Sequence, residues 1–122
     1  MDSFNTALAG AWLAVAYIKT RSLWFPLGVH WAWNWMMGAV LGLPVSGITS
    51  LTPQPLLRVA SNAPEWLTGG SYGIEGGVAC TLALTLSTIF IWRTRFISPT
   101  PEMKAFTDAE KPNTRLRPTA LN

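Results

Sequence analysis

Apolar residues gather in three segments within the first 92 positions of the chain. The segments cover residues 4–18, 22–43 and 74–92, and polar or glycine-rich stretches separate them. The second segment has no charged residue and is long enough to cross a hydrocarbon layer of about 30 Å as a helix. An isolated strand in lipid would leave its backbone groups unpaired, so the pattern predicts a helix for each segment.

The pattern as a whole predicts an all-α fold, a multi-pass membrane helical bundle with about three transmembrane helices. Residues 44–73, between the second and third segments, are rich in proline, glycine, serine and threonine, which is typical of a loop. Residues 93–122 are polar and interrupted by proline, so we predict a disordered tail there.

Charge supports the membrane interpretation and predicts an orientation. Charged residues are 12% of the chain, and too few of them fall in residues 1–92 for an ordinary solvated surface. The basic residues Lys19, Arg21, Arg93 and Arg95 flank apolar segments, which is typical of membrane edges and not of nucleic-acid binding. Three antiparallel crossings bring both basic pairs to one side, which we predict to be cytoplasmic together with the tail.

Two polar residues, His30 and Asn34, lie inside the uncharged second segment. Their spacing puts them on one helix face, about 6 Å apart. At roughly 13 Å below the basic turn, such residues usually face a bundle interior or a cavity. They can form an interhelical hydrogen-bond pair, which spacing alone favours, or act as paired donors that stabilise an oxyanion.

The sequence has few residues that could form a metal site or a redox centre. It contains one histidine, so His30 alone cannot make a zinc site, and no cofactor is identifiable from these residues. Cys80, the only cysteine, lies in an apolar run and is interpreted as a packing residue.

The glycine-rich stretch 66–77 reads WLTGGSYGIEGG and is interpreted as a series of turns, because it lacks the ending of a phosphate-binding loop. Glu75 within it fits an acidic residue at a helix N-terminus. A role as catalytic base would require it to reach His30, but Glu75 is expected near the outer edge of the membrane and His30 in its inner half.

The residues around His30 also resemble a known family. Residues 5–34 read NTALAGAWLAVAYIKTRSLWFPLGVHWAWN. They are similar to the region of the third motif in the CPBP family of intramembrane endopeptidases, also called Abi or type II CAAX prenyl protease-like, with its N…LAG helix, basic turn, SLW.P and HxxxN. The loop sequences GLPVSGIT and EWLTGGSYGIEGG extend the resemblance, so that it covers roughly residues 5–92.

The resemblance implies a helical membrane bundle that cleaves peptides within the bilayer, in some members after a prenylated cysteine. The family carries the motifs EExxxR, FxxxH and HxxxN, and His30 and Asn34 match the third, for which the implied role is oxyanion stabilisation. The sequence has neither adjacent glutamates nor a second histidine. Residues 1–92 are therefore expected to be the C-terminal part of such a protease domain, with the missing helices upstream, and the chain to be inactive alone.

Partners and location follow from the same resemblance. The expected partners are the lipid bilayer and, in a complete member, a peptide or prenylated peptide, with nucleic acid excluded. The expected location is the bacterial inner membrane, and the resemblance leaves open whether a divalent metal takes part in the complete, metalloendopeptidase-like member. The absent motifs also leave open whether the chain is an enzyme. The alternative is a small non-catalytic membrane protein, a pseudoprotease or helical partner that binds a peptide or a subunit.

Overall fold

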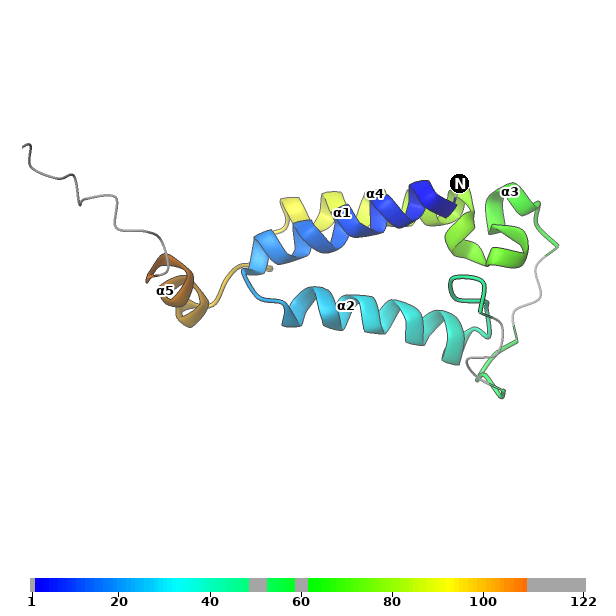
Figure 1. Ribbon diagram of the computed structural model, residues 1–122, viewed down its shortest axis with the longest axis horizontal. Coiled ribbons are helices and arrows are strands. Elements are labelled where there is room, and N and C mark those ends of the chain that lie inside the picture. The colour runs from blue at the N-terminus through cyan, green and yellow to red at the C-terminus, as the bar shows by residue number, and fades with distance from the viewer. Residues whose placement is uncertain (1, 49–52, 59–61, 110–122) are drawn as a thin grey trace, which may run out of the picture.

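The computed structural model describes residues 2–48, 53–58 and 62–109, and these residues form helices, turns and loops (Figure 1). The all-α prediction is confirmed for this part of the chain, in which the sole β-type pairing is an isolated bridge between Val45 and Ile48. The elements are α1 (Asp2–Thr20), α2 (Trp24–Trp35), a π-helix η1 (Met36–Val40), α3 (Glu65–Thr68), two 3₁₀ turns η2 (Gly70–Tyr72) and η3 (Ile74–Gly76), α4 (Val78–Arg93) and α5 (Pro101–Ala109).

Helices α1 and α4 lie side by side and run in the same direction, while α2 runs back along them (Figure 1). Their contact contains the hydrophobic core. Trp12 and Ala16 of α1 are buried, four positions apart and therefore on one helix face. They pack with the buried residues of α4, which are Cys80, Leu84 and Ile91. The interpretation of Cys80 as a packing residue agrees with its exposure of 3%.

A tight turn reverses the chain between α1 and α2. Arg21 adopts the left-handed conformation with φ 54°, and its N–H donates to the carbonyl of Tyr17. This geometry ends a helix, because the N–H satisfies one of the last free carbonyls. At the same end, the Lys19 ammonium donates to the carbonyl of Thr94 at 3.2 Å. The two basic regions therefore lie together, as three antiparallel crossings predict.

The predicted membrane spans are only partly reflected in the helices. Across the described ranges, none of the helices has both the length and the apolar character that crossing a membrane requires. The regular part of the second segment ends at Trp35, where the wider π-helix η1 begins. The third helix begins at Val78 and not at residue 74, because the glycine-rich residues before it form the 3₁₀ turn η3.

Helix α5 corrects the prediction of a wholly disordered tail. Pro101 occupies the first helical position, where its missing N–H costs nothing. The Thr100 hydroxyl accepts from the N–H of Met103 at 3.3 Å, so it caps the helix. The Arg21 guanidinium donates to the Asp108 carboxylate at 3.0 Å, which connects α5 to the turn after α1. The prediction for residues 110–122 lies outside the described residues.

The glycines of the 66–77 stretch permit close backbone approaches. Gly73 has φ 94°, and a Cβ atom there would overlap the carbonyl of Pro44. A Cβ atom on Gly77 would overlap the carbonyl of Leu67. The stretch therefore folds as a compact set of turns, as predicted, and directs the chain into α4.

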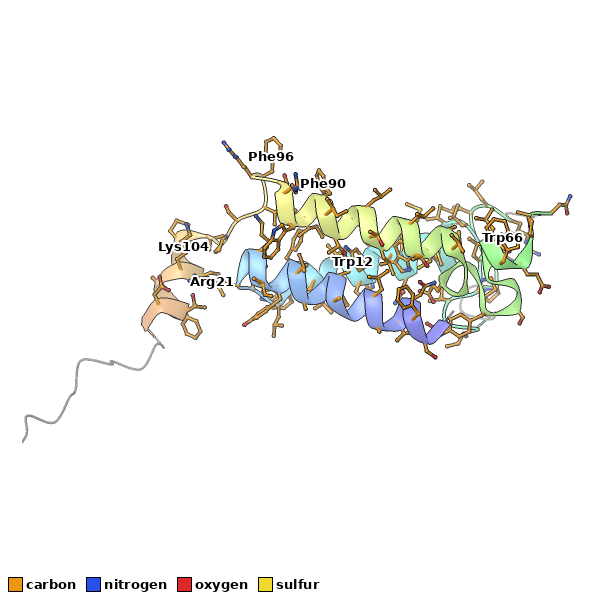
Figure 2. The ribbon with its side chains drawn as sticks, turned by 90° about the horizontal axis from the view of Figure 1, so that it is seen from above. Trp12, Arg21, Trp66, Phe90, Phe96 and Lys104 are labelled. Carbon is orange, nitrogen blue, oxygen red and sulfur yellow. The ribbon has the colours of Figure 1, made fainter. Side chains whose placement is uncertain are left out.

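Large apolar side chains cover the outward faces of α2 and α4. On α2 they form one stripe at helical spacing, consisting of Trp24, Leu27, Trp31 and Trp35, and the last two indoles stack with ring centroids 6.2 Å apart. Phe90 and the Phe96 that follows α4 project away from α1 (Figure 2). Exposed apolar residues on this scale are typical of a surface that contacts lipid or another protein.

Candidate functional site

A cavity of about 350 Å³ lies between α1, α2 and the start of α4. One part of its wall is apolar, and the other carries polar side chains from α1, the turns and the loop after η1. The lining residues include Ala9, Trp12, Leu13 and Leu84 on the apolar part, and Asn5, Thr6, Ser46, Tyr72 and Glu75 on the polar part. His30 and Trp33 contribute from α2.

His30 and Asn34 occupy different positions relative to this cavity. His30 lies in the middle of α2, has an exposed side chain and lines the cavity. Asn34, one turn further along, is half-buried and is not among the lining residues. Within residues 2–48, 53–58 and 62–109, neither side chain forms a hydrogen bond. Their polar atoms therefore do not connect α2 to α1 or α4.

Trp33, which lies between His30 and Asn34, does form a side-chain hydrogen bond to another segment. Its indole N–H donates to the Glu75 carboxylate at 3.0 Å. Its ring also meets Trp12 edge-on, with centroids 6.0 Å apart and planes at 66°, a favourable geometry for two aromatic rings. These two contacts lie on the face of α2 that packs against the core.

Glu75 connects three separate segments of the chain. One carboxylate oxygen accepts from Trp33, and the other accepts from the N–H and the hydroxyl of Ser46, at 2.6 and 3.0 Å. Its main-chain carbonyl accepts from the Asn5 amide at 2.7 Å. Glu75 and His30 line the same cavity. The carboxylate is already engaged by three donors, which favours a structural role over that of a base.

Asn5, the first residue of the N…LAG pattern, makes polar contacts that the sequence does not indicate. Only 2% of it is exposed, and its amide donates to the carbonyls of Glu75 and Gly77 at 2.7 and 3.0 Å. Its side-chain oxygen accepts from the hydroxyl of Thr81 at 2.6 Å. A polar amide in an otherwise apolar helix was the available signal, because such a group is buried only with hydrogen-bond partners.

The cavity does not by itself make a metal site. In the part of the chain that the structure describes, no three histidine, cysteine, aspartate or glutamate side chains gather closely enough to hold an ion. Zinc in particular requires three or four protein ligands. His30 contributes a single imidazole nitrogen at most.

Comparison with known proteins gives one match. Residues 2–36 match the family described as type II CAAX prenyl endopeptidase Rce1-like. The match covers α1, α2 and the HxxxN spacing of His30 and Asn34, so the family resemblance is supported at this N-terminal end of the chain. No curated protein and no solved structure matches the chain.

Proposed function

We propose that the chain supplies the oxyanion-stabilising half of a CAAX prenyl endopeptidase-like active site. The observation that carries the proposal is that His30, inside the matched residues 2–36, has an exposed imidazole at a cavity and no hydrogen-bond partner in the described ranges. These properties suit a hydrogen-bond donor to a substrate, because an acceptor within the protein would compete with the substrate for the imidazole N–H.

In this proposal the His30 N–H donates to the oxygen that becomes negative when water attacks a peptide carbonyl. The Asn34 amide is the second donor, one helical turn away. Activation of the water belongs to the EExxxR and FxxxH motifs, which this sequence does not contain. Peptide hydrolysis needs both a base and a stabilised oxyanion, so the chain is expected to be inactive without those groups.

We further propose that the chain resides in a membrane, in bacteria the inner membrane, with its C-terminal tail in the cytoplasm. Exposed tryptophans on α2 and exposed leucine and phenylalanine on α4 support this location. So do the basic residues gathered at the end where Lys19 meets Thr94. After expression, the chain should sediment with membranes and resist alkaline carbonate extraction. Recovery in the carbonate wash would contradict the proposal.

Complementation tests the catalytic role. The chain is co-expressed with a complete family member whose own HxxxN histidine has been replaced, and cleavage of a farnesylated peptide is followed by mass spectrometry. We expect cleavage only when both chains are present. In that pair, His30→Ala should lower the rate by about 10²–10³-fold, the usual effect of losing one oxyanion donor.

Two further variants make the test specific. His30→Gln retains an N–H donor and should keep more activity than His30→Ala. Thr85→Ala is the control, because this exposed threonine bonds within its own helix and does not line the cavity. Unchanged cleavage in His30→Ala would contradict the oxyanion role.

The same experiment tests the second candidate function, a non-catalytic membrane protein that binds a peptide or a subunit. The exposed apolar stripe on α2 favours this candidate, since it can serve a binding surface without chemistry. If the two chains co-purify but cleavage never appears in any combination, this candidate replaces the first.

A further inference from the structure

Glu75 has no part in the oxyanion stabilisation proposed for His30 and Asn34. Among the described residues it is the only charged side chain in the cavity wall, and its two carboxylate oxygens bind two different parts of the chain. One oxygen holds α2 through Trp33. The other holds the loop after η1 through Ser46.

The hydrogen bond between Glu75 and Trp33 lies close to His30 along α2. Trp33 follows His30 by three positions, so the two side chains are neighbours on the helix surface. The Glu75 carboxylate and the Trp12 ring hold the Trp33 indole from two sides. Two contacts on one indole restrict rotation of α2 about its axis and, with it, the direction of His30.

The loop after η1 also depends on Glu75, through the conformation of Ser46. Ser46 adopts the left-handed conformation with φ 49°, which costs a residue other than glycine roughly 1 kcal/mol. Both its N–H and its hydroxyl point to the Glu75 carboxylate. A charged acceptor with two donors from one residue compensates for that conformation.

We infer that Glu75 is a positioning residue, which orients His30 towards the cavity by holding Trp33 and holds the opposite wall through Ser46. The inference rests on the proposed function of His30. Glu75 touches neither the substrate nor the reacting atoms in this arrangement. It acts through the indole N–H of Trp33.

The single histidine of the chain allows a test that needs no activity. The full chain, with ¹⁵N-labelled histidine and tryptophan, is placed in detergent micelles, and the imidazole nitrogen signals are those of His30 alone. Trp33→Phe keeps an aromatic ring against Trp12 and removes the N–H together with the five-membered part of the indole, so it should fold. We expect Trp33→Phe and Glu75→Ala to shift or split the His30 signals in the same way, and the double variant to do no more than either.

Matched controls change the same chemical groups elsewhere. Glu65→Gln removes a charge from the exposed glutamate of α3, and Trp66→Phe removes an indole N–H from an exposed tryptophan. Both should leave the His30 signals unchanged. Glu75→Gln, which keeps an acceptor oxygen for Trp33, should produce a smaller change than Glu75→Ala.

Kinetics in the complemented peptidase give the second readout. Misplacement of His30 should lower kcat by about 10²-fold in Glu75→Ala with little change in KM, since the interaction lost is one made in the transition state. Unchanged His30 signals in both Trp33→Phe and Glu75→Ala would overturn the positioning role. If cleavage fails in every combination while the His30 signals still respond, the proposed function fails and the positioning role stands.

Discussion

The hydroxyl of Thr81 donates to the side-chain oxygen of Asn5 at 2.6 Å, and this bond joins the first turns of the two helices that form the core. The Asn5 amide donates at the same time to the carbonyls of Glu75 and Gly77. Both donor and acceptor groups of the Asn5 side chain are therefore engaged where α4 begins. This arrangement holds the entry of α4 against α1.

Replacing Asn5 should destabilise the chain more than its size suggests. Asn5→Ala removes three hydrogen bonds, of which the one to Gly77 is buried and the other two are partly buried, and each group left unsatisfied costs about 1–3 kcal/mol. We expect a loss of several kcal/mol in the free energy of unfolding, measured by denaturant titration in detergent. The control Thr85→Ala, at an exposed site, should change it by less than about 0.5 kcal/mol. Equal effects of the two variants would contradict the role of Asn5.

Two glycines should respond to the same substitution in opposite directions. A Cβ atom on Gly77 would overlap the carbonyl of Leu67, so Gly77→Ala should cost about 1–3 kcal/mol. Gly28, inside α2, has no atom near the place of a Cβ, and alanine is the better helix former there by about 0.5–1 kcal/mol. Thermal unfolding followed by circular dichroism measures both. A stabilised Gly77→Ala would contradict the close approach of residue 77 to the Leu67 carbonyl.

The start of α5 should depend on pH. A hydrogen bond from its own backbone N–H, and then one with Thr100, lower the pKa of Glu102 below its ordinary value of 4.5. A carboxyl whose pKa is lower in the folded than in the unfolded chain stabilises the fold when ionised. That contribution is present above pH 4.5 and is lost as the pH falls through the lowered pKa. The ¹³C carboxyl shift of Glu102 should titrate below 4.5, and Glu102→Gln should remove the dependence. A midpoint above 4.5 would contradict this prediction.

His30 and Asn34 should contribute unequally to cleavage. His30 lines the cavity and Asn34 does not, so a substrate oxygen in the cavity meets the imidazole first. In the complemented peptidase, Asn34→Ala should lower kcat by roughly 10-fold, against about 10²-fold or more for His30→Ala. Loss of activity in Asn34→Ala equal to that in His30→Ala would show that the two donors act as one unit.

The sequence predicts the main helices because their apolar runs are long and uncharged. It predicts their ends less well. The third apolar run begins at residue 74, but the glycines before Val78 permit backbone approaches that a helix cannot make. The pattern does not predict helix α5, because proline in a polar stretch usually breaks a helix. At Pro101 the residue stands where a helix begins, after a threonine that caps it.

For the site, the sequence indicates His30 and Asn34 but not the contacts around them. The spacing i, i+4 correctly puts both on one helix. It cannot show that Trp33, between them, carries the hydrogen bond to Glu75, because that bond joins residues 42 positions apart. The signal that was available was the isolation of Glu75, an acidic residue in a stretch with few charges. Such a residue is retained near apolar surroundings only when donors surround it.

The π-helix η1 (Met36–Val40) has a consequence for the register of the chain. Its wider turn carries one residue more than an α-helix would need, and the Leu41 N–H accordingly donates to Met36, five positions earlier. The carbonyls of Ala39 and Val40 instead accept from Leu56 and Leu57. Deleting one residue here would continue α2 as a regular helix and rotate everything after it by about 100°. The loop after η1 would then lose its alignment with Glu75, so the additional residue of the π-helix sets how the helix of His30 is joined to the wall opposite it.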